Sequence, residues 1–227
     1  MPITLRENID AGVIAIWKVA ESLDDLILLA GLSEQDSIVY AAISAPHRKK
    51  EWLATRILLN ELIGAKSRIA YHSDGRPFIE NSSCNISVSH TSIYVSIFLC
   101  RNAMPGIDIE LVTRQVGRVA KRFLSTEELT TCYDGHEYSN WKLLVHWCAK
   151  EAIFKMVPLN DIEFATDIHI KYDGSISDSG TFHGSFEFVT GSAPIALSYR
   201  ILDELLIVWG SIEKEALEGH QYSVLMD

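Results

Sequence analysis

The sequence lacks the features that mark secreted, disulfide-bonded or membrane-spanning proteins. Its four cysteines are widely spaced and include no C-x-x-C pair, which is typical of reduced thiols rather than of a disulfide framework or a zinc site. No basic stretch leads into an apolar segment near the N-terminus, so we expect no signal peptide. The first apolar run, Ala11 to Trp17, ends at Lys18 and is too short to cross a bilayer. These absences predict a cytoplasmic protein with no membrane partner.

Positive charge is also scarce. The 227 residues contain 20 Lys and Arg against 30 Asp and Glu, which gives a formal net charge of −10. Proteins that bind nucleic acid or anionic lipid across their surface need clustered cations, so we expect no nucleic-acid partner. A small phosphorylated ligand held by a local basic patch is still compatible with this composition. With 48% hydrophobic residues, the chain is long enough to fold around a core without a disulfide or a metal.

Several common motifs are missing as well. The sequence contains no P-loop, no Rossmann glycine pattern, no H-E-x-x-H and no G-x-S-x-G. His146 and Cys148 stand two positions apart in a helical pattern and face different ways, so they make a poor metal-binding pair. The candidates for chemistry are therefore a few short segments of carboxylate, serine and basic residues.

The chain has a weak internal repeat. Ser33 and Ser125, 92 residues apart, each begin an S-x-x-[DE] pattern that predicts a helix N-cap. A strand-like run precedes each serine, and a longer helical pattern follows, over 47–63 and 141–157. Each half then ends in strand and turn signals, as at Asp173-Gly174.

This order predicts an α+β fold of two similar halves, residues 1–104 and 105–227, with the active site between them. Each half would be an antiparallel sheet packed with a long helix. The alternative interpretation of the apparent repeat is a chance similarity between amphipathic elements. Two halves in one chain form the cleft without a partner chain, so we expect a monomer.

The first candidate segment is Gly106-Ile107-Asp108-Ile109-Glu110. On a strand, Asp108 and Glu110 share one face, and the two isoleucines pack on the other. Neighbouring carboxylates repel each other unless a cation neutralises them, and oxygen ligands on a rigid strand suit Mg²⁺. An exposed acidic sheet edge is the alternative interpretation.

The second candidate lies within Trp147 to Lys155, which has a helical pattern. Glu151 and Lys155 are four residues apart and share one helix face. They form either a surface ion pair or a functional pair, in which Glu151 is a metal ligand or a base and Lys155 binds a phosphate.

Two further segments are candidates for phosphate contacts. In Asn85 to His90, strand alternation turns Ser89 one way and His90 the other, so they are poorly placed as a nucleophile and its base. At the end of a strand they can still reach a phosphate. His47 to Lys50 opens a long helix, where phosphates bind, although such a run is often only a solvated face.

Five motifs follow one another along the chain: Asp74-Gly75-Arg76-Pro77, Asn85 to His90, Gly106 to Glu110, Phe123 to Glu127, and Trp147 to Lys155. In this order they resemble the 4′-phosphopantetheinyl transferase superfamily, over about Arg48 to Lys155. Length and apparent duplication are similar to the two-half, surfactin-type branch rather than to the short, trimeric branch. The chain departs from the family at Cys148, where Ser or Thr is usual, and in lacking a glycine soon after Lys155.

The resemblance implies transfer of the phosphopantetheine arm of coenzyme A (CoA) to a serine of an apo carrier protein, with release of 3′,5′-ADP. The enzyme would be a Mg²⁺-dependent transferase of the holo-[acyl-carrier-protein] synthase type. By position, Mg²⁺ would be held by Asp108, Glu110 and Glu151. The catalytic residues would be Glu151, Lys155 and Asp108, with Glu151 as our hypothesis for the base, acting directly or through a metal-bound water. The residues expected to bind CoA are Arg48, Lys50, Arg76, Ser89, His90 and Lys155, and Arg56 also matches a family position.

A basic stretch follows the carboxylate strand. From Leu111 to Arg122 there is no acidic residue, and a helix there would align four cations in one stripe: Arg114, Arg118, Lys121 and Arg122. Since carrier proteins are typically acidic, we expect the carrier to dock on this stripe. A solvated helix face is the alternative.

Two other functions compete with transfer to a carrier. One is a catalytically silent CoA-binding protein of the same fold, although all three carboxylates and Lys155 are present. The other is a different Mg²⁺-dependent transferase that acts on a diphosphate.

Overall fold

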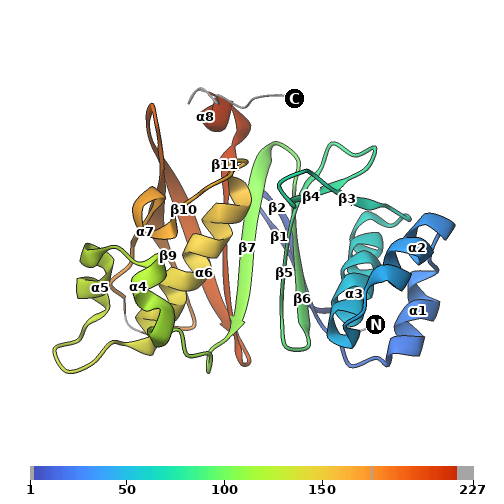
Figure 1. Cartoon of the computed structure of the whole chain (residues 1–227), viewed down its shortest axis with the longest axis horizontal. Helices are drawn as coiled ribbons and strands as arrows, with labels where there is room; N and C mark the ends of the chain where they lie inside the picture. Colours follow the sequence, from blue (N-terminus) through green and yellow to red (C-terminus); the bar gives the residue numbers. More distant parts are fainter. Residues whose placement is uncertain (1–2, 175, 219–227) are drawn as a thin grey trace.

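The chain forms two antiparallel sheets with helices on their outer sides (Figure 1). The computed structural model describes residues 3–174 and 176–218. Sheet 1 has the strand order β1 (Ile3–Ile9), β2 (Gly12–Lys18), β6 (Tyr94–Cys100) and β5 (Asn85–Thr91). Sheet 2 has the order β7 (Ala103–Leu111), β11 (Leu205–Glu213), β10 (Gly191–Leu202), β9 (Ser179–Phe188) and β8 (Ile168–Lys171). A small hairpin of β3 (Ile69–Tyr71) and β4 (Pro77–Ile79) stands apart.

The helices divide between the two sheets (Figure 1). Beside sheet 1 lie α1 (Leu23–Ala30), α2 (Glu34–Ala42) and the long helix α3 (Pro46–Ile63). After β7 come a 3₁₀ turn, η1 (Gly117–Val119), and the helices α4 (Ala120–Phe123), α5 (Thr126–Cys132), α6 (Asn140–Met156) and α7 (Phe164–Asp167). The last described helix is α8 (Lys214–Glu218). None of the helices in the described part of the chain has the length and apolarity needed to span a bilayer.

Local sequence explains where the helices begin. The Ser33 hydroxyl accepts a hydrogen bond from the Asp36 backbone, 3.1 Å away, as expected of an N-cap. Ser125 forms a full capping box with Glu128, whose side chain accepts from the Ser125 backbone at 2.8 Å. Both predicted N-caps are therefore confirmed, as are the two long helices.

Three apolar layers hold these elements together. The layer between α3 and sheet 1 includes Ala15, Trp17, Leu53, Leu58 and Ile97. The layer between the two sheets includes Ile14, Ile16, Phe98, Ile107, Ile109 and Ile207. The layer between α6 and sheet 2 includes Leu144, Ala149, Ile153, Phe182 and Leu197. The molecule is therefore built as helices, sheet, sheet and helices, in that order (Figure 1).

The two sheets also meet edge to edge, where β5 lies beside β7. We call this line the seam. The Ser87 hydroxyl accepts from the Ile107 backbone N–H at 3.1 Å, and the Ser89 hydroxyl accepts from the Ile109 N–H at 3.3 Å. Serine side chains thus satisfy backbone donors on the free edge of β7 that a neighbouring strand would otherwise bind.

The predicted α+β class with antiparallel sheets is confirmed. Sheet 1 ends at Cys100 and sheet 2 begins at Ala103, and the division into two related halves stays a prediction. The basic stretch after β7 is not one helix, because an irregular segment and η1 precede α4. β-branched Val112, Thr113 and Val116 and the poor helix former Gly117 account for this.

Candidate active site

Strand β7 turns its two carboxylates toward α6. Ile107 and Ile109 are fully buried in the layer between the sheets, so Asp108 and Glu110 face the other way. Asp108 is only 5% exposed and Glu110 only 6%. The predicted alternation is confirmed, and burial excludes an exposed acidic edge.

A glycine lets α6 cross β7 at this point. A Cβ atom at Gly106 would overlap the carbonyl oxygen of Ala152, so only glycine allows the helix so close to the strand. Lys155, three residues beyond Ala152 on α6, donates to Asp108 Oδ1 at 2.8 Å and to the Ile107 carbonyl at 2.9 Å. The close approach therefore brings the two main candidate segments of the sequence into one cluster.

Glu151 lies in the same cluster and is electrostatically perturbed. Burial raises the pKa of its carboxyl, and Asp108 raises it further, while Lys155 and Arg114 oppose the shift. The buried Cys148 thiol lies under the cluster, and burial and then Asp108 raise its pKa well above the usual range. A glutamate with a raised pKa suits a proton acceptor that works near neutral pH.

Glu110 has a cation of its own. The Arg114 guanidinium contacts the Glu110 carboxylate and also lies over the Trp147 ring, 5.1 Å from its centroid. The Thr91 hydroxyl donates to Glu110 Oε2 at 3.0 Å. Neither contact was expected from the sequence, because the Arg114 segment was interpreted as part of a helix and Thr91 was not singled out.

The carboxylates fit a hard divalent cation by their chemistry, although no preformed metal cluster is present. Among the described residues, no group of three or more His, Cys, Asp or Glu side chains is arranged to hold a metal ion. Asp108 Oδ2, however, is buried and has no strong hydrogen-bond donor among the described residues: Ser89 and Lys155 bind Oδ1, and the nearby Cys148 thiol is a weak donor. A buried carboxylate oxygen without a partner is costly, and a bound cation would satisfy it.

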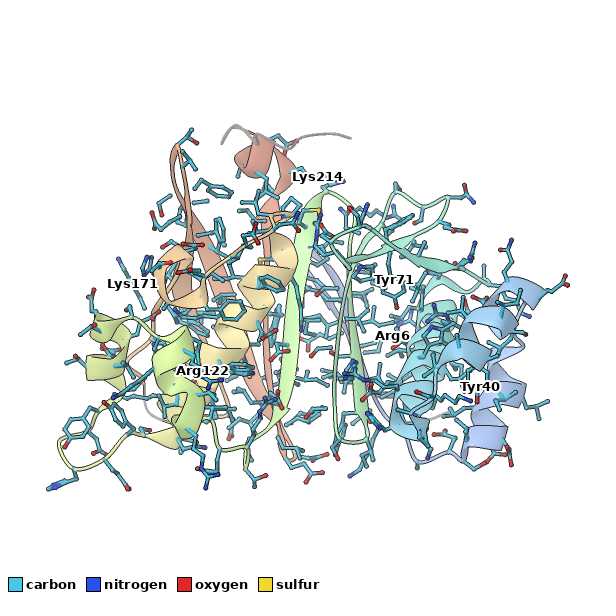
Figure 2. The ribbon with its side chains drawn as sticks, viewed as in Figure 1. Arg6, Tyr40, Tyr71, Arg122, Lys171 and Lys214 are labelled. Carbon is cyan, nitrogen blue, oxygen red and sulfur yellow. The ribbon has the colours of Figure 1, made fainter. Side chains whose placement is uncertain are left out.

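A cavity of about 550 Å³ opens on the α3 side of the cluster; we call it the basic cavity. Its wall carries two carboxylates, Glu51 and Asp74, and five basic side chains: Arg48, Arg56, Arg76, His90 and Lys155. Tyr71, at the end of β3, also lines it (Figure 2). Clustered cations in a concave site are typical of a binding site for a phosphorylated ligand.

His90 connects the basic cavity to α3. Its Nε2 lies 3.4 Å from Arg48 Nη1, and its Nδ1 lies 3.4 Å from Glu51 Oε1. Burial lowers the His90 pKa, with Glu51 opposing and Arg48 and Lys155 adding to the shift. At neutral pH the ring is therefore mainly uncharged and can accept or donate a hydrogen bond.

Four of the six predicted CoA-binding residues line the basic cavity: Arg48, Arg76, His90 and Lys155. Lys50 does not, because its Nζ donates to the Glu21 carbonyl at 3.0 Å. Ser89 lies buried in the seam, where its hydroxyl donates to Asp108 Oδ1 at 2.8 Å.

A second cavity, of about 540 Å³, opens on the other side of α6. We call it the α4–α6 cavity. Glu151, Arg114, Arg122, Phe123 and Trp147 are among the residues that line it. Figure 2 shows Arg122 on α4 and Tyr71 at β3, on opposite sides of β7. Lys155 thus borders one cavity and Glu151 the other, so that the carboxylate cluster lies between two open spaces.

Comparison with known families gives one match. Residues 104–197 match the model of the 4′-phosphopantetheinyl transferase superfamily. This range covers less than half of the chain but includes all of β7 except its first residue, with its two carboxylates, and all of α6. The match supports the superfamily and, as a general class of activity, phosphopantetheinyl transfer. The comparison with curated proteins gave no match.

Proposed function

We propose that this protein is a Mg²⁺-dependent transferase that moves the phosphopantetheine arm of CoA to a serine of an apo carrier protein. In our proposal it is a monomer of the two-half, surfactin type with holo-[acyl-carrier-protein] synthase activity, working in the cytoplasm. One observation carries the proposal: the cluster of Asp108, Glu151 and Lys155, of which Asp108 is buried and Lys155 lines the basic cavity, lies within the segment that matches the family.

The basic cavity would hold the nucleotide end of CoA. Arg48 and Arg76 would bind its phosphates, including the 3′-phosphate, and His90 would add a hydrogen bond. Lys155 lies where the cavity reaches Asp108, so it would contact the phosphate that is transferred. Ser89 and Lys50 complete the proposed set, and Lys50 would first have to leave the Glu21 carbonyl.

Asp108, Glu110 and Glu151 would hold Mg²⁺, which when bound neutralises charge on the pyrophosphate. The oxygen of the carrier serine attacks the phosphorus that bears the pantetheine. The bond from that phosphorus to the bridging oxygen breaks, and 3′,5′-ADP leaves with the electron pair. In our proposal Glu151 takes the serine proton, directly or through a metal-bound water, and Lys155 donates hydrogen bonds to the phosphoryl oxygens.

The carrier would approach from the α4–α6 cavity, onto which Glu151 opens. Four cations in the segment after β7 are exposed: Arg114, Arg118, Lys121 and Arg122. They offer an acidic carrier a complementary surface although they do not share one helix. Reversing the charge at Arg118 and Lys121 to Glu should raise KM for the carrier far more than KM for CoA; equal changes would exclude this docking surface.

The transfer is tested by intact-protein mass spectrometry. Apo carrier proteins of the fatty-acid and peptide-synthesis types are incubated with this protein, CoA and Mg²⁺. A mass gain of one phosphopantetheine arm, absent with EDTA or with Asp108→Ala, would establish the transferase. No gain on either carrier, while CoA still binds, would favour the silent CoA-binding protein. Neither gain nor CoA binding would refute the proposal.

A further inference from the structure

We propose that Arg114 is an exchangeable internal counter-ion, which neutralises Glu110 in the metal-free protein and leaves it when a divalent cation binds. Arg114 and the metal would therefore compete for the same carboxylate. This inference rests on the proposed function, because it concerns the metal ligands assigned there.

The contacts of Arg114 place it at the edge of the cluster. Its guanidinium contacts Glu110, whose side chain is 8% exposed, whereas the Arg114 side chain is 43% exposed. The guanidinium also lies over the Trp147 ring, and Arg114 and Glu151 line the same cavity. Arg114 thus reaches inward from the surface to a carboxylate that is otherwise almost closed off from solvent.

Charge balance favours the competition. With all three carboxylates ionised, their charge of −3 and the +2 of Lys155 and Arg114 leave the metal-free cluster at −1. A divalent cation added to the same groups would bring the cluster to +1 in a region of low exposure. Like charges held together with little solvent repel strongly, so one of the two side-chain cations has to move away.

Arg114 is the cation that can leave. Lys155 is fixed on α6 by two acceptors, Asp108 Oδ1 and the Ile107 carbonyl, and its side chain is 24% exposed. Arg114 is more exposed. Its backbone N–H donates to the Leu111 carbonyl and its carbonyl accepts from the Asn140 side chain, so it is the side chain alone that would move. The α4–α6 cavity beside it gives the guanidinium space to move while it keeps its contact with Trp147.

Manganese(II) binding tests the exchange without measuring activity. Free Mn²⁺ is quantified by electron paramagnetic resonance while it is titrated into wild type, Arg114→Gln, Arg114→Ala, Arg118→Ala and Asp108→Asn. Arg118→Ala is the matched control, because it removes an exposed arginine four residues further on. Circular dichroism confirms that each variant is folded. We expect both Arg114 variants to bind Mn²⁺ roughly three- to tenfold more tightly than wild type, as for loss of a partly exposed competing ion pair, and Arg118→Ala to match wild type.

The outcomes separate this inference from the proposed function. Equal Mn²⁺ affinity in wild type and both Arg114 variants, with binding lost in Asp108→Asn, would overturn the exchange and leave the metal site in place. Weaker binding in the Arg114 variants would also overturn it. No Mn²⁺ binding by any of the proteins would overturn both the exchange and the proposed metal site.

Discussion

Strands β2 and β7 both turn an apolar face toward the layer between the sheets. The faces that they turn toward their long helices differ: that of β2 is apolar, and that of β7 carries carboxylates. Each contributes two isoleucines to the layer between the sheets: Ile14 and Ile16 from β2, and Ile107 and Ile109 from β7. Toward its own long helix, β2 presents Ala15 and Trp17, which belong to the apolar layer under α3. Toward α6, β7 presents Asp108 and Glu110, which are also buried but carry carboxyl groups.

Their places in the sheets differ too. β2 is bonded on both sides, by β1 and β6, and contributes only apolar side chains to its helix layer. β7 is bonded by β11 on one side and has the serine hydroxyls of β5 on the other, with Lys155 and Arg114 close by. Burial of an ion pair rarely improves stability over apolar packing. We infer that the β2–α3 interface stabilises the fold and that the β7–α6 interface is kept for chemistry.

The largest effect is expected when the charge is removed from β7. Asp108→Asn keeps the size of the side chain but removes a metal ligand and the partner of Lys155, so kcat/KM should fall at least about 10³-fold. Tm should stay within a few degrees of wild type. Steady-state transfer assays measure kcat/KM, and calorimetry measures Tm. A kcat/KM close to that of wild type would contradict the inference that the β7–α6 interface is kept for chemistry.

Placing the charge on β2 should have the opposite consequence. Ala15 is fully buried against the α3 layer, so Ala15→Asp introduces a carboxylate among apolar side chains. We expect a loss of about 3 kcal/mol or more in the free energy of unfolding and a Tm lower by at least about 6 °C. Urea denaturation checks this, and a stability equal to that of wild type would mean that this layer also accepts charge.

Each of the two strands has a glycine shortly before the residues that face its long helix, and substituting these glycines tests the difference between β2 and β7 further. A Cβ at Gly12 would overlap the Leu99 carbonyl oxygen, and one at Gly106 would overlap that of Ala152. Gly12→Ala and Gly106→Ala should each lower the free energy of unfolding by about 1–3 kcal/mol. Only Gly106→Ala moves α6 away from Asp108, so at a temperature where both variants are folded its kcat alone should fall, by about 10²-fold. Equal kcat values in the two variants would contradict the claim that the close approach at Gly106 positions α6 beside Asp108 for catalysis.

The smallest effect concerns pH. His146 on α6 is completely buried, and burial lowers its pKa, whereas α3 has only the exposed His47. A lowered pKa in the folded state favours the neutral ring, so stability is full above the unfolded pKa of about 6.5 and declines as pH falls toward the folded value. Between pH 6.5 and 5.5, wild type should lose more stability than His146→Gln, while His47→Gln behaves as wild type. Identical pH profiles for all three would show that His146 does not titrate on unfolding.

Periodic patterns predicted much of the framework around both sheets. The two long helices, the serine N-caps and the alternation on β7 follow from local sequence, and the structure confirms them. Among the elements that were missed, two left a signal in the sequence. The strand β1 has alternating partly buried positions such as Ile3 and Leu5, and α1 begins with a capping box at Ser22.

Other features depend on tertiary contacts and had no local signal. The direction of Lys50 is set by the Glu21 carbonyl, 29 residues away in the chain. The Ser89 hydroxyl binds Asp108 and the Ile109 backbone in the seam because β5 lies beside β7. No pattern within either strand indicates that the two strands are neighbours. The pairing of Arg114 with Glu110, four residues apart, is by contrast a local contact, and it was missed because the segment after β7 was expected to form one helix.

A crystal structure with CoA and Mg²⁺ would test the central claim most directly. The account predicts the nucleotide in the basic cavity beside Arg48 and Arg76, and the pyrophosphate between Lys155 and a metal ion bound by Asp108. CoA bound away from β7, with Lys155 still paired to Asp108 and no metal at the carboxylates, would contradict it.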